Sequence, residues 1–129
     1  MSNIIECRSV SFSYNEGNNK TEVLKNLNFE IKSGETTAII GQSGCGKSTL
    51  LNLMAGLDTP TDGDVLIANT NISKISEKDR TELRAKNLGF VYQFHHLLND
   101  FSSLYNVALP LLIMGVDKSG ALLKLSLIY

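Results

Sequence analysis

The sequence has 129 residues, which is enough for one domain but too short for two independent cores of comfortable size. Twelve Lys and Arg residues against 13 Asp and Glu give a formal net charge of −1, and 43% of the residues are hydrophobic. These values exclude collagen-like, disulfide-rich and wholly disordered chains. They also leave no excess of positive charge, so we expect no nucleic acid as a partner.

The sequence shows no export signal and no stretch suited to crossing a membrane. The first residues, MSNIIE, lack the basic segment before an apolar one that marks a secretory signal. The most apolar window, Val107–Val116, is about half as long as the roughly 20 residues that a spanning helix needs, and it contains Pro110. Cys7 and Cys45 belong to no cluster of metal ligands, so a reducing compartment without a structural zinc site is expected. We therefore expect a cytoplasmic protein.

Three segments in the first third of the chain are predicted to be strands. Apolar and serine residues alternate over Val10–Tyr14, which indicates a half-buried antiparallel strand. After a polar loop at residues 15–20, apolar residues alternate again over Leu27–Ile31. Residues Thr36–Ile40 are nearly all apolar or β-branched, as in strands that are buried on both faces of a parallel sheet.

Helices are predicted after these strands. Lys47–Ala55 has apolar residues at helical spacing and is followed by glycine. Ser76, with an aspartate three residues later, resembles a capping box that opens a polar helix to about Lys86. A further apolar helix is expected from Ser103, interrupted or bent by Pro110.

Two more strands are predicted between and after these helices. Asp64–Ala68 follows a segment that is dense in turn residues. Leu88–Tyr92 is a second short apolar run. The order of strand, glycine-rich loop and helix around residues 36–55 is typical of an α/β protein.

Residues Gly41–Ser48, GQSGCGKS, match the phosphate-binding pattern G-x-x-x-x-G-K-[ST] and are called the phosphate loop below. The glycines permit backbone conformations that turn successive N–H groups toward an anion. Lys47 can reach the terminal phosphates, and the hydroxyl of Ser48 can bind Mg²⁺. Because a strand is predicted before the loop and a helix after it, we predict binding of a nucleoside triphosphate with Mg²⁺.

Several motifs together extend this pattern to one family. They are VSFSY at 10–14, VLKNL at 23–27, IKSGE at 31–35, the phosphate loop, LLNLMAGLDTPTDG at 50–63 and GFVYQ at 89–93. Over residues 1 to about 116 the chain resembles the N-terminal half of the ATPase subunit of ABC transporters. Residues 92–101 and 106–110 are most similar to the lipoprotein-releasing and macrolide-exporter branch of that family.

The resemblance implies roles for particular residues. Tyr14 would stack on adenine; the alternative from the residues alone is a tyrosine that ends an amphipathic strand. Gln93 would contact Mg²⁺ and the attacking water, so Lys47 and Gln93 are the expected catalytic residues, and Ser48 and Gln93 the expected metal ligands. The predicted ATP-binding residues are Tyr14, Gly41, Gln42, Ser43, Gly44, Cys45, Gly46, Lys47, Ser48 and Thr49.

The resemblance also implies a fold and partners. The fold is an α/β, P-loop NTPase fold of ABC type with an N-terminal antiparallel β subdomain. A membrane permease would dock near residues Gln93–Pro110, a second ATPase subunit would complete a dimer, and the protein would lie at the inner face of the cell membrane. We expect His95 and His96 to face solvent or the partner, since adjacent histidines without a third ligand rarely bind zinc.

Motifs of a complete family member are not found in the 129 residues. These are the Leu-Ser-Gly-Gly-Gln signature, the Walker B strand and the switch histidine, and the apolar run before Asp117 is a poor Walker B because Lys118 follows it. We therefore divide the chain into residues 1–116, the N-terminal part of the nucleotide-binding domain, and a divergent tail at 117–129, which a shifted reading frame or a truncated gene would explain. Hydrolysis by this chain alone should be negligible.

Two other functions stay open from the sequence. The chain is alternatively a hydrolysis-incompetent fragment or regulatory module that binds nucleotide, or a different P-loop protein such as a small kinase. In the family, the strand at Thr36–Ile40 pairs with the Walker B strand. Without that neighbour its edge would be open, so we expect low solubility and oligomerisation.

Overall fold

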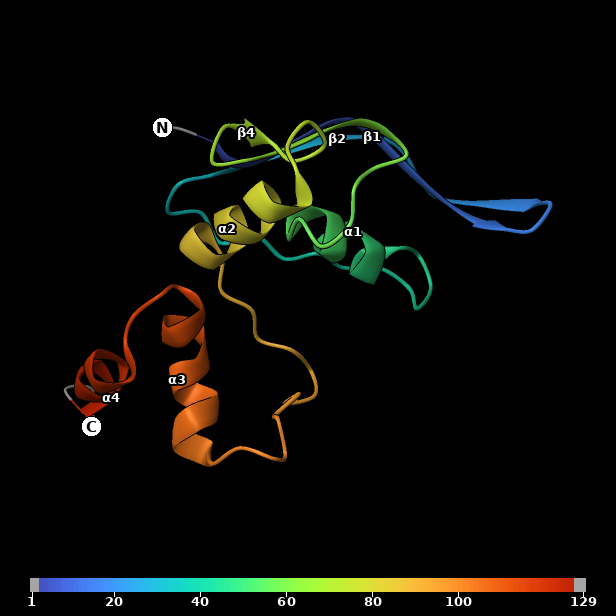
Figure 1. Ribbon diagram of the computed structural model, residues 1–129. Coiled ribbons are helices and arrows are strands. Elements are labelled where there is room, and N and C mark those ends of the chain that lie inside the picture. Colours follow the sequence, from blue (N-terminus) through green and yellow to red (C-terminus); the bar gives the residue numbers. More distant parts are fainter. Residues whose placement is uncertain (1–2, 127–129) are drawn as a thin grey trace. The chain divides into compact units, whose positions relative to one another are not determined.

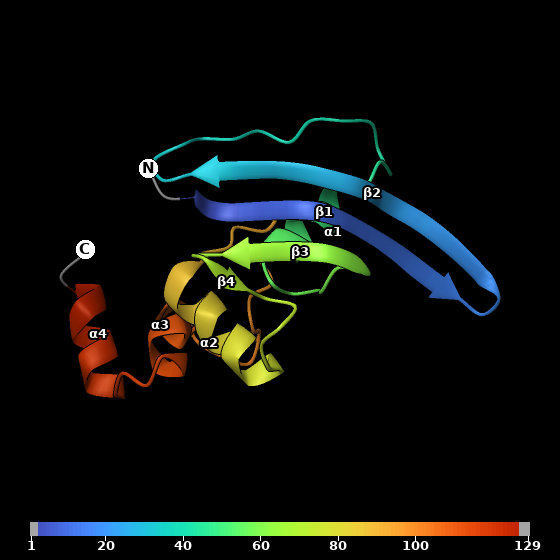
Figure 2. The same cartoon turned by 90° about the horizontal axis from the view of Figure 1, so that it is seen from above.

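The computed structural model describes residues 3–126 and divides the chain into two units, residues 1–81 and 82–129, which are considered separately. The strands and helices of the described residues are labelled in Figure 1, except β3, which is labelled in Figure 2. They are β1 (Asn3–Glu16), β2 (Asn19–Lys32), α1 (Lys47–Met54), β3 (Asp62–Ile67), β4 (Thr70–Asn71), α2 (Glu77–Asn87), α3 (Ser103–Ile113) and α4 (Lys118–Ser126).

The first unit contains a four-stranded antiparallel sheet with the strand order β2-β1-β3-β4 (Figure 2). In β1, Cys7 pairs with Phe29 of β2 on one side and with Val65 of β3 on the other. Helix α1 lies against one face of the sheet, as Figures 1 and 2 both show. The buried apolar side chains of this unit are Cys7, Val10, Phe12, Leu24, Leu53, Met54, Ala55, Val65, Ile67 and Ile72.

The hairpin of β1 and β2 is longer than the sequence predicts. The polar segment at residues 15–20 is mostly strand, and only Gly17 and Asn18 form the turn between the two strands. Gly17 has φ 61°, the left-handed conformation that two-residue hairpin turns require and that glycine adopts without strain. The prediction of a longer loop was therefore wrong, because a two-residue turn lets the polar residues continue the strand ladder.

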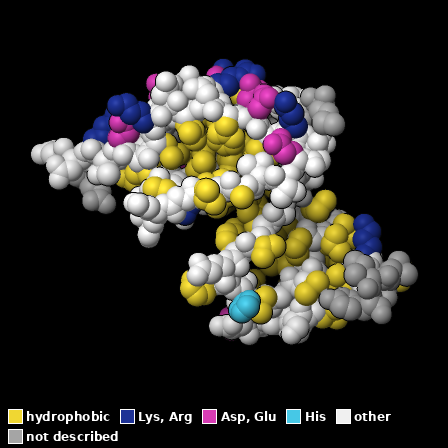
Figure 3. All heavy atoms as spheres, turned by 180° about the vertical axis from the view of Figure 1, so that it is seen from behind, with side chains coloured by type: hydrophobic (Ala, Val, Ile, Leu, Met, Phe, Trp, Pro, Cys, Tyr) yellow, Lys and Arg dark blue, Asp and Glu magenta, His cyan; other side chains and the backbone are white. Residues whose placement is uncertain are grey.

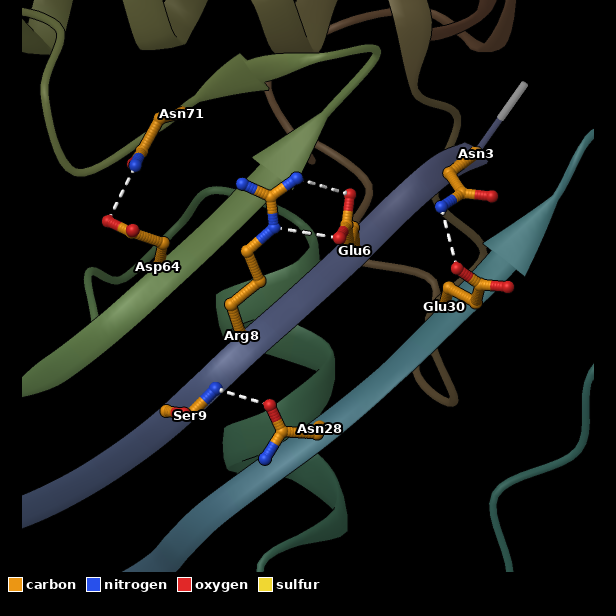
Figure 4. Close-up of polar contacts among 8 residues, drawn as sticks. All are labelled: Asn3, Glu6, Arg8, Ser9, Asn28, Glu30, Asp64 and Asn71. Atoms are coloured by element: carbon orange, nitrogen blue, oxygen red, sulfur yellow. Dashed lines mark hydrogen bonds and ion pairs between the residues drawn. The ribbon is translucent and has the colours of Figure 1, made fainter.

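Several polar side chains on β1 and its neighbouring strands form hydrogen bonds close to a bulge in β1 (Figure 4). Arg8 donates two hydrogen bonds to the carboxylate of Glu6, at 2.7 and 3.0 Å, and this hydrogen bonding lowers the pKa of Glu6. Ser9 has φ 49°, and its N–H donates to Oδ1 of Asn28 at 2.8 Å. The pairing of β1 shifts register on both sides here, so the strand bulges between Cys7 and Val10.

Three helices begin close to the residues that the sequence predicts. Helix α1 starts at Lys47, and α2 starts after Ser76, whose Oγ accepts a hydrogen bond from the N–H of Asp79 at 3.1 Å and donates to its carboxylate at 2.7 Å. Helix α3 starts at Ser103 and continues through Pro110 to Ile113, so the proline does not interrupt the helix, and the alternative of a bend at Pro110 stays a prediction. A proline removes a single N–H donor, and the rest of this apolar helix is long enough to continue past it.

Two predicted strands are not strands in the structure. Residues Thr36–Ile40 and Leu88–Tyr92 have no strand partner within the described residues, and the side chains of Ile40 and Val91 are 90% and 102% exposed. A strand needs a neighbouring strand to pair with its N–H and C=O groups, and an apolar sequence alone does not supply one.

Figure 3 shows hydrophobic side chains at the surface of each unit. The expected oligomerisation stays a prediction.

In the second unit, α3 packs against α4. Ala108 of α3 and Ala121 and Leu125 of α4 form a small buried cluster, with Leu111 and Leu112 packed against it. The apolar residues of the tail at 117–126 thus cover part of α3, whereas residues 127–129 lie outside the described part. No single helix within residues 3–126 has both the length and the hydropathy of a membrane span, and α3 and α4 reach them only jointly, across a bend of 118°.

Candidate functional site

The phosphate loop, Gly41–Ser48, follows an extended segment and leads directly into α1. Gly44 and Gly46 have φ angles of 79° and 94°, a conformation that L side chains rarely adopt. A Cβ atom on Gly46 would lie 2.9 Å from Cγ1 of Val23 and 3.0 Å from Cδ2 of Leu24 in β2. The loop therefore needs glycine at position 46 both for its backbone angle and for its close packing against the hairpin.

Lys47 folds back over the loop that precedes it. Its Nζ donates hydrogen bonds to the carbonyl oxygens of Gly41 and Gln42, at 2.7 and 2.6 Å, and lies 3.7 Å from Sγ of Cys45. A Cβ on Gly41 would lie 2.6 Å from the same sulfur atom, so a larger residue here would require the Cys45 side chain to move. The loop thus curls around an ammonium group, which is a suitable point charge for the terminal phosphates of a nucleotide.

The N-terminus of α1 adds positive potential at the same place. The residue before the helix is Gly46, no side chain caps the first turn by a hydrogen bond, and the first turn contains no acidic residue. Backbone N–H groups at a helix N-terminus favour anions. Ser48 is exposed in this turn, where a hydroxyl can serve as a ligand to Mg²⁺ beside a bound phosphate.

Tyr14 of β1 lies next to the same turn of α1. Its hydroxyl is 3.4 Å from Oγ1 of Thr49, and its ring meets the ring of Phe12 edge-on, with centroids 4.9 Å apart. The side chain of Tyr14 is nevertheless 46% exposed, so part of the ring is accessible to a ligand. The structure thus brings together Tyr14 and the residue that follows Ser48. No sequence pattern predicts the contact between Tyr14 and Thr49, because the two residues are 35 positions apart in the chain.

Gln93 belongs to the second unit. It is exposed and lies in residues 88–102, which contain no helix or strand. Its predicted contacts with Mg²⁺ and water stay predictions.

The residues around Gln93 are rich in exposed aromatic and apolar side chains. The rings of Phe90 and Tyr92 stack with centroids 5.9 Å apart, and His96 meets Tyr92 edge-on at 5.1 Å. Other side chains of this segment with an exposure between 43% and 70% are Phe94, Leu97, Leu98 and Phe101. Over the part of the chain that is described, no three His, Cys, Asp or Glu side chains come together as a metal site.

The two cysteines differ in burial, and we expect them to differ in reactivity for that reason. Burial, with a smaller effect of the Glu6 carboxylate, raises the pKa of the Cys7 thiol to about 11, whereas Cys45 is exposed in the phosphate loop. The thiolate is the reactive form, so at about pH 8 we expect iodoacetamide to modify Cys45 and to leave Cys7 unmodified in the folded chain. Mass spectrometry of the digested protein measures both, with urea-unfolded protein as the control. Equal modification of both thiols under native conditions would contradict the structure of β1.

Comparison with known proteins identifies the family. The family model described as ABC transporter matches residues 24–125. The match contains the whole phosphate loop and Gln93, and it extends into α4.

Solved structures agree with this assignment. The ATP-binding cassette MJ0796, a dimer in a post-hydrolysis state bound to ADP and phosphate, is similar to this chain with a TM-score of 0.84 and 35% identity, over 92% of this chain and 52% of that one. A second dimeric structure of this bacterial ABC transporter cassette gives 0.84 and 36%, with the same coverage. The protein cbiO1 from Clostridium perfringens, part of the ABC transporter complex cbiONQ, gives 0.73 and 31%, over 94% and 47%.

The predicted fold class is thereby confirmed, including the antiparallel β subdomain at the N-terminus. This chain spans about half the length of the solved structures that it resembles. The family model covers most of its residues, and identities above 30% accompany the structural similarity. The chain therefore belongs to the ABC transporter family.

Proposed function

We propose that this chain binds Mg-ATP and is the N-terminal part of an ATP-binding subunit of an ABC transporter. The observation that supports this most strongly is the position of the Lys47 ammonium inside the phosphate loop, at 2.7 and 2.6 Å from the carbonyl oxygens of Gly41 and Gln42. The uncapped N-terminus of α1 provides N–H donors for the phosphates, and the exposed hydroxyl of Ser48 provides a ligand for Mg²⁺.

In this proposal Tyr14 provides the adenine platform. The Tyr14 ring is half-exposed, packs at right angles to the Phe12 ring and contacts Thr49 through its hydroxyl, so part of its surface is open for stacking. The base and the phosphates then bind to one unit of the chain, residues 1–81. Gln93 would sense the metal and the attacking water from the segment that follows α2.

The partner of the transporter subunit is proposed to be a membrane permease of the lipoprotein-release or macrolide-export type. Its docking segment would be Gln93–Pro110, where exposed aromatic and apolar side chains suit a short inserted helix. A second cassette is proposed as the dimer partner, since both MJ0796 structures are dimeric. These partners would place the protein on the cytoplasmic face of the cell membrane.

The test of nucleotide binding compares ATP with a ligand that has phosphates but no base. We expect Tyr14→Ala to weaken binding of Mg-ATP about tenfold and to leave binding of Mg-tripolyphosphate unchanged, because base stacking contributes about 1–3 kcal/mol. Tyr105→Ala is the matched control, since Tyr105 lies in the second unit and stacks on Phe101. Isothermal titration calorimetry measures both ligands.

Two results of this titration would count against the proposal. Equal loss of ATP and tripolyphosphate binding in Tyr14→Ala would show that Tyr14 shapes the loop rather than the base site. A wild-type chain that is folded by circular dichroism and binds neither ligand would refute the proposed function.

A further inference from the structure

Tyr14 and Thr49 are 35 positions apart in the sequence, and their side-chain hydroxyls lie 3.4 Å from each other. Thr49 is in the first turn of α1 and is 8% exposed, whereas Tyr14 is near the end of β1 and is 46% exposed. The contact is a long hydrogen bond, but one of its partners is buried, where competition with water is weak. The tip of the Tyr14 ring is therefore tied to the helix that carries Ser48.

A second contact restrains the same ring. Phe12 precedes Tyr14 by two residues and so lies on the same face of β1. Its ring is 9% exposed and meets the Tyr14 ring at an interplanar angle of 80°. Packing against Phe12 restrains the ring of Tyr14 along its side. The hydroxyl contact with Thr49 adds a second restraint, at the tip of the ring.

We propose that Thr49 is a positioning residue for base recognition. Its hydroxyl holds the Tyr14 ring beside the first turn of α1, so that adenine can stack while the phosphates bind the loop that the same helix follows. A ring that is already in its bound orientation loses less conformational freedom when the base arrives, and binding is tighter. The inference rests on the proposed function, because it requires a purine nucleotide in the phosphate loop.

The alternative role for Thr49 is a direct hydrogen bond to a phosphate. Thr49 follows Ser48 in the turn that faces the anion site, so a hydroxyl that left Tyr14 would have an acceptor there. The two roles predict different results. A positioning residue affects only ligands that carry a base, whereas a phosphate ligand affects every ligand that carries the phosphates.

The experiment is a double-mutant cycle of Tyr14→Phe and Thr49→Val in the full chain, titrated with Mg-ATP and with Mg-tripolyphosphate. We expect each single variant to weaken ATP binding about two- to fivefold, the double variant to be no weaker than either single variant, and tripolyphosphate binding to stay the same in all. Thr49→Ser keeps the hydroxyl and should restore ATP binding to within about twofold of wild type. Circular dichroism melting without ligand checks that each variant is folded.

Three results would overturn the inference while leaving the proposed function intact. These are additive effects of the two substitutions on ATP binding, weaker tripolyphosphate binding in Thr49→Val, and unchanged ATP binding in Tyr14→Phe. The comparison of Tyr14→Phe with wild type tests the inference even if Thr49→Val does not fold. A folded wild-type chain that binds neither ATP nor tripolyphosphate would instead refute the proposed function, and the inference with it.

Discussion

Replacing Lys47 with alanine is expected to remove nearly all stabilisation of this chain by Mg-ATP. The Lys47 ammonium is the charged group around which the phosphate loop curls, with the carbonyl oxygens of Gly41 and Gln42 at 2.7 and 2.6 Å. A hydrogen bond to a charged group contributes about 1.5–3 kcal/mol, so if the ammonium turns from these two carbonyls to two phosphate oxygens when ATP binds, its loss should raise Kd by at least about a hundredfold.

The measurement is the change in melting temperature on adding nucleotide. A ligand at 100 times its Kd stabilises the folded state by about 2.7 kcal/mol, which corresponds to roughly 10–20 °C for a unit of this size. At the same ATP concentration, Lys47→Ala should gain only about 0.4 kcal/mol, or about 2–3 °C. Without nucleotide, its melting temperature should stay close to that of wild type, because the two loop carbonyls are exposed and can bind water instead.

Lys78→Ala is the matched control for this experiment. Lys78 is an exposed lysine in the first turn of α2 and lies outside the phosphate loop. Its removal changes the net charge by the same amount, so it should keep the full ATP-dependent shift. If Lys47→Ala were stabilised as strongly as Lys78→Ala, the phosphate loop would not be the nucleotide site.

The sequence predicted best those features that depend on neighbouring residues. The phosphate loop, the start of α1 at Lys47 and the cap of α2 at Ser76 are all encoded within one or two turns of chain. Gly46 is an example. Its positive φ of 94° could be expected from the residues of the phosphate loop alone, without knowledge of the rest of the chain. These elements lie where they were expected within one or two residues.

The features that failed depend on partners that are distant in sequence. Thr36–Ile40 and Leu88–Tyr92 have the composition of buried strands, yet a strand forms only beside another strand. An apolar, β-branched composition favours a strand when a second strand is available for pairing. It does not tell whether that second strand is present. The contact of Tyr14 with Thr49 escaped prediction for the same reason, because it depends on how β1 passes α1.

A large loss of folding stability is expected for Gly63→Ala, in β3. Gly63 has φ 84°, and a Cβ at this position would lie 2.3 Å from the carbonyl oxygen of Ser9 and 2.6 Å from that of Arg8. Both obstacles are backbone atoms of β1, at the bulge where the pairing of β1 with β3 shifts register, so neither can move aside by changing a rotamer. The variant must pay for the left-handed conformation, about 1–2 kcal/mol, and must also separate the two strands.

We expect a loss of stability of about 4 kcal/mol or more for Gly63→Ala, which is comparable to the whole stability of a unit of about 80 residues. Tyr14 lies on the same strand, β1, so ATP binding should be lost together with the fold. Urea unfolding followed by circular dichroism measures the change. Gly17→Ala separates the two causes: Gly17 also has a positive φ, 61°, but a Cβ there meets no atom within 4 Å, so this variant should lose only about 1 kcal/mol. Equal stability of the two variants would mean that β1 and β3 do not approach each other as closely as Gly63 requires.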